Sequence, residues 1–137
     1  MNEQTCPWAI KDADGKTIGI GVPVINKAFY FADVPENDKE MNWFKAMEFA
    51  EKRGRSLPSK KEMYIVLFYK DEINAIAAEA GHPDFLSGWA WSSTEYSTYS
   101  AWYVNSGSGY VGSNYKYNTY YVVRPVAALS SPLSLSP

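Results

Sequence analysis

The side chains of this sequence that are best suited to recognition are tyrosines concentrated in one segment. The chain has 137 residues and eleven Tyr, and eight of the Tyr lie between Ser92 and Tyr121, where Ser, Gly, Asn and Thr fill most of the other positions. Tyr offers a large amphipathic contact area with few rotatable bonds, while Ser, Gly and Asn offer adaptable hydrogen bonds. This Tyr-rich window, residues 92–121, therefore predicts a binding surface. The alternative is a β-rich segment in which Tyr is only a strand former.

The predicted ligand-binding residues are aromatic and small polar side chains spread over the window. They are Tyr96, Tyr99, Tyr103, Asn105, Ser106, Ser108, Tyr110, Gly112, Ser113, Asn114, Tyr115, Tyr117 and Asn118. A few desolvated aromatic side chains dominate the energy of such interfaces. We expect this role for Tyr99, Tyr103, Tyr110, Tyr115 and Tyr117, and we expect strands and loops to bring the five rings to one face.

Catalytic and metal-binding patterns are weak by comparison. His82, the one His, lies in a Gly-His-Pro turn with no nucleophile or acid that the sequence places beside it. Cys6, the one Cys, has no nearby His and no lipidation signal. Residues 12–16 (DADGK) resemble the start of a calcium loop but lack its third acidic position and its later Glu. We therefore predict no catalytic residues, no metal site and no cofactor.

The charge balance and hydropathy narrow the choice of partners. Thirteen Lys and Arg against fifteen Asp and Glu give a net charge of −2, which argues against a nucleic-acid partner. No apolar run approaches the ~18 residues of a membrane span, so we expect no membrane insertion. The first residues (MNEQTCPW) lack the basic and apolar regions of a signal peptide.

Local patterns predict strands first and helices next. Two apolar runs, 9–11 and 17–24, flank an Asp-Gly turn, which indicates a hairpin, and residues 27–33 fit a third strand. Helical spacing recurs from Trp43 to Ala50, with a possible capping box formed by Asn37 and Glu40. Ser59 as N-cap, with Glu62 three residues later, indicates a second helix. A third helix is indicated from about Asp71 and ends at Gly81.

The second half of the chain has the pattern of short strands. We predict them at 89–92, 101–105, 109–115 and 120–128, separated by Ser, Gly and Asn. Alternation places Trp102 and Val104 on the face opposite Tyr103. From this we expect Trp91 and Trp102 in the core, and Tyr103, Tyr110 and Tyr115 exposed. The order of elements predicts one α+β domain over residues 1–129, followed by a flexible tail at 130–137.

Several segments resemble a C-type-lectin-like family that includes the variable proteins of diversity-generating retroelements, functionally akin to the major tropism determinant of phages. They are residues 91–95 (WSSTE), 101–105 (AWYVN) and 122–126 (VVRPV), together with Trp43, Ala46, Ala50, residues 54–59 (GRSLPS) and Glu62. The resemblance covers roughly Trp43 to Leu129. It implies a C-type-lectin-like fold in which N-terminal strands and helices pack on a strand-rich C-terminal half.

Codon chemistry in this family makes the resemblance more specific. Template adenines are randomised there, often in AAC codons, and this reaches Tyr, Ser, Thr, Gly and Asn but not Trp, Lys, Glu, Gln or Met. Between Tyr96 and Tyr121 only Trp102 and Lys116 lie outside that reach. We interpret these two residues, together with Val104 and Val111, as fixed scaffold.

The resemblance implies a non-enzymatic protein that binds a protein or glycan receptor on a cell surface, as a phage or prophage receptor-binding component or an adhesin. Such a component would sit at a phage fibre tip or in the cytoplasm before lysis, and a homo-oligomer is compatible with it. The calcium-lectin patterns Glu-Pro-Asn and Trp-Asn-Asp are missing, and the single Cys6 does not match the cysteines of formylglycine-generating enzymes. The alternatives are a glycan-binding or structural adhesion domain of fixed specificity and, third, an enzyme with a metal or cofactor.

Overall fold

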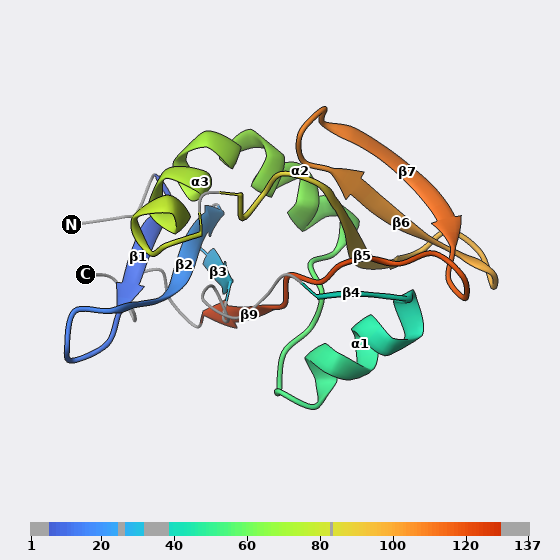
Figure 1. Ribbon diagram of the computed structural model, residues 1–137, viewed down its shortest axis with the longest axis horizontal. Coiled ribbons are helices and arrows are strands. Elements are labelled where there is room, and N and C mark those ends of the chain that lie inside the picture. The colour runs from blue at the N-terminus through green and yellow to red at the C-terminus, as the bar shows by residue number, and fades with distance from the viewer. Residues whose placement is uncertain (1–5, 25–26, 32–38, 83, 130–137) are drawn as a thin grey trace.

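Two β-sheets with helices between and beside them make up the part of the chain that the computed structural model describes, residues 6–24, 27–31, 39–82 and 84–129 (Figure 1). Within these residues there are three helices and nine strands, and the sheets are mostly antiparallel. The α+β class predicted from the sequence is confirmed. The expected tail, 130–137, lies outside the described residues.

The first sheet is built around the predicted hairpin. Its order is β1-β2-β3-β9, with every neighbouring pair antiparallel, and its strands are β1 (Trp8–Lys11), β2 (Thr17–Val24), β3 (Lys27–Phe31) and β9 (Val126–Leu129). In the β1–β2 turn Gly15 has a φ of 81°, and the Asp12 carboxylate accepts hydrogen bonds from the backbone N–H groups of Asp14 and Lys16. The carboxylate of Asp12 therefore stabilises a turn. The last two residues of the predicted strand 27–33 lie outside the described residues.

The second sheet contains the Tyr-rich window. Its order is β4-β8-β5-β6-β7, and only the β5–β8 pair is parallel. The strands are β4 (Glu40–Met41), β5 (Trp89–Glu95), β6 (Ser100–Asn105), β7 (Tyr110–Tyr115) and β8 (Tyr121–Val122). The single strand predicted at 120–128 is wrong, because β8 and β9 belong to different sheets. The chain leaves the ladder before Pro125, which has no N–H to donate to it.

The helices are α1 (Trp43–Glu51), α2 (Lys60–Phe68) and α3 (Lys70–Glu79). The capping box of α2 is confirmed, since Ser59 and Glu62 exchange hydrogen bonds between side chain and backbone. The capping box predicted for α1 is wrong. Glu40 lies in β4 and pairs with Val122 of β8, and Asn42 caps the helix instead. Asn37 lies outside the described residues. In the described part of the chain no helix has the length and apolar character needed to cross a membrane.

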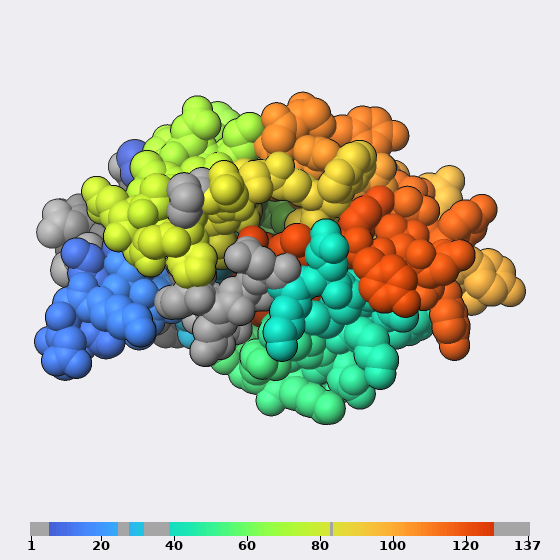
Figure 2. Space-filling view, viewed as in Figure 1, coloured from blue at the N-terminus to red at the C-terminus, as the bar shows by residue number. Residues whose placement is uncertain are grey.

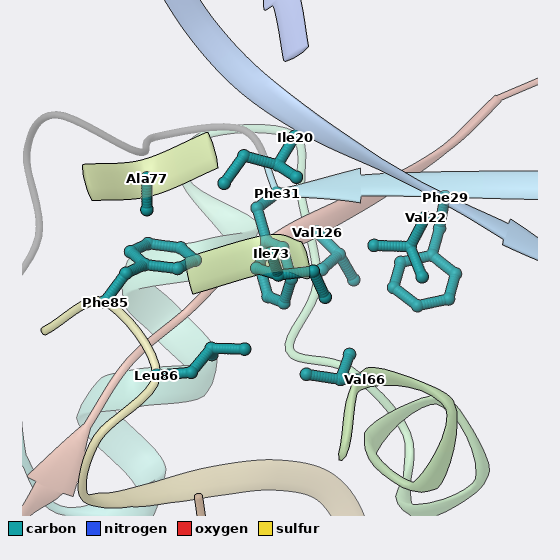
Figure 3. Packing of buried hydrophobic residues seen from close by; sticks show 10 residues of the cluster. All are labelled: Ile20, Val22, Phe29, Phe31, Val66, Ile73, Ala77, Phe85, Leu86 and Val126. Atoms are coloured by element: carbon teal, nitrogen blue, oxygen red, sulfur yellow. The ribbon is translucent and has the colours of Figure 1, made fainter. Parts of the chain in front are cut away.

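The main hydrophobic core fills the space between the first sheet and helices α2 and α3 (Figure 3). Phe31 from β3 and Phe85 from the loop after α3 meet edge to face there, with ring centroids 5.2 Å apart. Ile73 and Ala77 are fully buried on the inner face of α3. This core fixes α2 and α3 on the first sheet. The second sheet forms the other end of the molecule (Figure 1).

The second sheet is packed on both faces. On one face Trp91 and Tyr103 join a cluster with Trp43 of α1. On the other face Ala90 and Val104 pack against Met63 of α2. Alternation along a strand separates two faces but does not say which one is buried, and here both are.

This double packing corrects the predicted environments of two neighbouring residues. Tyr103 is only 7% exposed, whereas Trp102 is half-buried, with the Lys60 ammonium 3.5 Å from its ring centroid and Tyr96 against its edge. Tyr103 was expected at the surface and Trp102 in the core, and both expectations are wrong. Those for the buried Trp91 and the exposed Tyr110 and Tyr115 are confirmed.

We predict that Tyr103→Ala destabilises the protein more than Trp102→Ala. The first change empties a buried ring site and should lower the free energy of unfolding by about 3 kcal/mol or more. The second removes a ring that is already partly in water, so its cost should be smaller. Urea unfolding of both variants measures the difference. A larger loss from Trp102→Ala would contradict the observed packing of β6.

Candidate binding surface

The Tyr-rich window forms one end of the molecule, opposite the four-stranded sheet (Figure 1). Figure 2 shows its orange and red-orange atoms gathered at that end of the long axis. Most of its Tyr side chains are more than half exposed: Tyr96, Tyr99, Tyr110, Tyr115, Tyr117 and Tyr120. So many large exposed rings over so short a stretch are typical of an interaction surface.

A buried lysine lies beneath part of this surface. The side chain of Lys116 is 3% exposed, and its ammonium group forms a salt bridge with Glu95 and donates to the carbonyl oxygen of Thr98 at 2.9 Å. The same group lies 4.6 Å from the ring centroid of Trp43 and 5.8 Å from that of Phe44. Carboxylate, carbonyl and aromatic faces together compensate a charge that would be costly to bury alone.

The backbone around Lys116 connects three segments, the β5–β6 turn, the end of β7 and the first turn of α1. Its N–H donates to the carbonyl of Tyr99 at 2.9 Å, and its carbonyl accepts from the N–H of Trp43 at 3.1 Å. Asn42, the cap of α1, donates through its side chain to the carbonyl of Tyr117. The β5–β6 turn, the end of β7 and the first turn of α1 are thus held together. The interpretation of Lys116 as scaffold agrees with its burial.

An open cleft of about 460 Å³ lies over this junction. Four exposed rings surround it: Phe44, Tyr99, Tyr115 and Tyr117, with Thr98, Lys116 and Asn118 completing the lining. Phe44 is held between two other rings, with centroids 5.5 Å from Trp43 and 5.6 Å from Tyr117. The cleft brings together four of the predicted binding residues, Tyr99, Tyr115, Tyr117 and Asn118.

A second aromatic group lies on the α1-side face of the sheet. Trp89 stacks on Tyr121 with ring centroids 5.7 Å apart, and Tyr103 contacts both rings and Tyr110. Trp89 is 45% exposed and Tyr110 58% exposed, so this group reaches solvent. Gly112 lies beneath it, because a Cβ built there would come within 2.7 Å of the Tyr110 ring. An aromatic surface separate from the cleft results.

The turn between β6 and β7 holds three predicted binding residues and uses two of them internally. Ser106 is 2% exposed, and its carbonyl accepts from the Lys70 ammonium, so it does not belong to the exposed surface. The Asn105 side-chain oxygen accepts from the N–H groups of Gly107 and Ser108. Ser108 itself is exposed.

The predicted residues therefore do not converge on one face. Tyr110 and Tyr115 are five positions apart on β7, and an odd spacing in a strand points side chains to opposite faces. Tyr103 is buried, Asn114 bonds to the Tyr121 hydroxyl, and Ser113 lies across from Trp102 near Tyr96. The cleft is lined by residues of the β5–β6 turn and the end of β7. The β6–β7 turn lies at the opposite end of these strands (Figure 1).

Two exposed aromatic residues were missed by the sequence reasoning. Phe44 lies within the helical run predicted from Trp43 to Ala50, and Trp89 within the strand predicted at 89–92, and neither was predicted to bind a ligand. A signal for Phe44 was present, because adjacent side chains of a helix point about 100° apart and Trp43, Ala46 and Ala50 mark the buried side. No comparable pattern marks Trp89, since the exposure of a strand residue depends on what covers its face.

Comparisons with known proteins bring no family to this chain. No protein-family model matches it, and a search of curated proteins finds no match. Among the described residues, His, Cys, Asp and Glu form no group of three or more that could hold a metal ion. Evidence on the function of this chain therefore comes from the geometry of the window.

We predict that Lys116 and Glu95 are energetically coupled. Glu95→Gln removes the charged partner of a buried ammonium group, but the Glu95 side chain is itself 59% exposed and screened by water, so the cost should be about 1 kcal/mol of unfolding free energy. In a Lys116→Met background the same change should cost much less, because no buried charge remains. A double-mutant cycle from urea unfolding gives the coupling. Equal costs in both backgrounds would show that the pair contributes nothing.

We also predict a pH dependence that originates at Tyr103. Burial raises the pKa of its phenol above the ordinary value of 10.0, and the neighbouring Tyr121 and Tyr110 add to the increase. The folded state therefore binds more protons than the unfolded state once the pH exceeds about 10, and stability falls as the pH rises from there through the folded pKa. Tyr103→Phe should reduce this fall, as measured by unfolding between about pH 9 and pH 11. A slope that Tyr103→Phe leaves unchanged would contradict the assignment to Tyr103.

Proposed function

We propose that this chain is a non-enzymatic ligand-binding protein of C-type-lectin-like fold whose Tyr-rich window is a diversified receptor-binding surface. The observation that carries the proposal is the division of the window into exposed Tyr side chains and a buried framework. Lys116 and Val104 are at most 2% exposed, while the Tyr side chains around them reach 77%. The exposed Tyr residues of such a surface can be substituted, which changes what the surface binds, without disturbing the buried residues beneath them.

The segments that carry the family resemblance support the proposal because they build the framework. Trp91 is fully buried, and its indole N–H donates to the carbonyl of Met41 at 2.9 Å. Leu57 is buried, and Ser59 with Glu62 caps α2. Val123 to Val126 is buried throughout and connects the two sheets. Residues that determine a fold in this way are the ones a shared fold would preserve.

The two residues of segment 96–121 that randomised AAC codons cannot encode, Lys116 and Trp102, are both at least partly buried. Lys116 is buried and Trp102 is half-buried under Lys60. Tyr99, Tyr115 and Tyr117, which lie within that reach, surround an open cleft. A segment whose Tyr served only as strand formers would not need three of them at turns and strand ends, where β-propensity has little effect.

The genomic setting tests the diversified character directly. Sequencing the DNA that flanks the gene should find a reverse transcriptase gene and a near-identical copy of the segment encoding residues 92–121, with adenines at the differing positions. A flanking region with neither would leave a binding domain of fixed specificity. The two results separate diversification from binding as such.

Receptor binding should depend on the exposed Tyr residues of the window. We predict that Tyr99→Ser or Tyr117→Ser weakens binding to a cell-surface receptor by about 2 kcal/mol, some thirtyfold, where that ring is a principal contact. The matched control is Tyr64→Ser on α2, which removes an exposed ring outside the window. Binding to host cells can be measured by flow cytometry with labelled protein. Normal binding by every window variant would refute the proposal.

A further inference from the structure

We propose that the cleft bordered by Phe44, Tyr99, Tyr115 and Tyr117 receives an apolar side chain, aromatic or long aliphatic, projecting from a protein ligand. This inference rests on the proposed function and specifies the chemistry of its ligand. It also extends the site beyond the Tyr-rich window to Phe44 of α1. Phe44 then becomes a fixed wall of a cleft whose other rings come from the window.

The walls of the cleft suit a flat or branched apolar group. Its four bordering rings are between 46% and 77% exposed, so each retains surface that a ligand can cover. Phe44 is held edge to face by Trp43 and Tyr117, which reduces the entropy lost when a ligand packs against it. A volume of about 460 Å³ is large enough for a single side chain with part of its backbone.

The ammonium group of Lys116 and three backbone carbonyls at the floor of the cleft already have partners within the protein. Lys116 and Glu95 form a salt bridge, and the carbonyl of Thr98 accepts from the Lys116 ammonium. The carbonyls of Tyr99 and Tyr117 accept from the backbone of Lys116 and the side chain of Asn42. What the floor and walls offer a ligand is therefore mainly ring surface.

This pairing favours a protein side chain over a sugar. A sugar ring carries several hydroxyl groups, and each one that loses water needs a directed hydrogen-bond partner. The described lining includes no carboxylate, and its one ammonium group, that of Lys116, is already paired with Glu95, so no unpaired charge in the lining faces the hydroxyls of a sugar or an ionic ligand. An apolar side chain needs only contact area, which the rings supply.

The probes for the test are small analogues of each ligand class. N-acetyl-L-phenylalaninamide and N-acetyl-L-leucinamide represent apolar side chains, and methyl β-D-galactopyranoside and methyl α-D-mannopyranoside represent sugars. Each is titrated into the full ¹⁵N-labelled chain while amide chemical shifts are recorded. We expect saturable shifts from the amino-acid amides at Thr98, Tyr99 and residues 115–118, and none of comparable size from the sugars.

The decisive variant is Phe44→Ala, because it removes a wall of the cleft without substituting any residue of the window. We expect it to weaken binding of N-acetyl-L-phenylalaninamide about tenfold. The matched control is Phe68→Ala, which removes a 79% exposed Phe from α2 and should leave the affinity unchanged. Thermal unfolding of both variants verifies that neither change has altered the fold.

Several results would overturn the inference. Shifts centred on Trp89 and Tyr110, undiminished binding by Phe44→Ala, or sugar binding in the cleft without binding of the amides would each do so. Cleft shifts that depend on protein concentration without any probe would identify a second copy of the chain as the occupant. If receptor binding depends on the window but the amides do not bind, only this inference fails. If the amides bind the cleft while no window variant affects the receptor, the proposed function fails instead.

Discussion

The ammonium group of Lys116 determines how the Tyr-rich end of the molecule is assembled. A charge in a nearly dry environment is stable only when partners surround it, and here they come from two parts of the chain that are distant from Lys116 in sequence. Glu95 and the Thr98 carbonyl come from the β5–β6 region, and the ring of Trp43 comes from α1. The turn, the strand end and the helix start must therefore lie together before the surface rings can be placed.

The packing of the second sheet restricts where a binding surface can form. Helix α1 covers one face around Trp91 and Tyr103, and helix α2 covers the other around Ala90 and Val104. In this sheet the exposed rings therefore lie on the edge strand β7, at strand ends and in turns. Two separate groups of exposed rings result, one around the cleft over Lys116 and one that contains Trp89 and Tyr110.

Those features that depend on neighbours in the sequence were predicted well. The Asp-Gly turn, the capping box of Ser59 and Glu62, and the end of α3 near Gly81 all involve contacts within about one turn of chain. Features that depend on distant partners were predicted poorly. The strand expected at 120–128 divides between two sheets, and the helix cap expected at Asn37 is replaced by Asn42 because Glu40 is recruited into β4.

The sequence by itself determined the α+β class, most of the local elements and the concentration of Tyr in one window, because these follow from composition, periodicity and turn chemistry. Tertiary structure alone decided which Tyr residues are exposed. Alternation separates Trp102 from Tyr103, but burial depends on the helices that cover each face of the sheet. The cleft was likewise decided by packing, since Phe44 and Tyr117 are far apart in the chain and meet only where Lys116 draws α1 onto the end of β7.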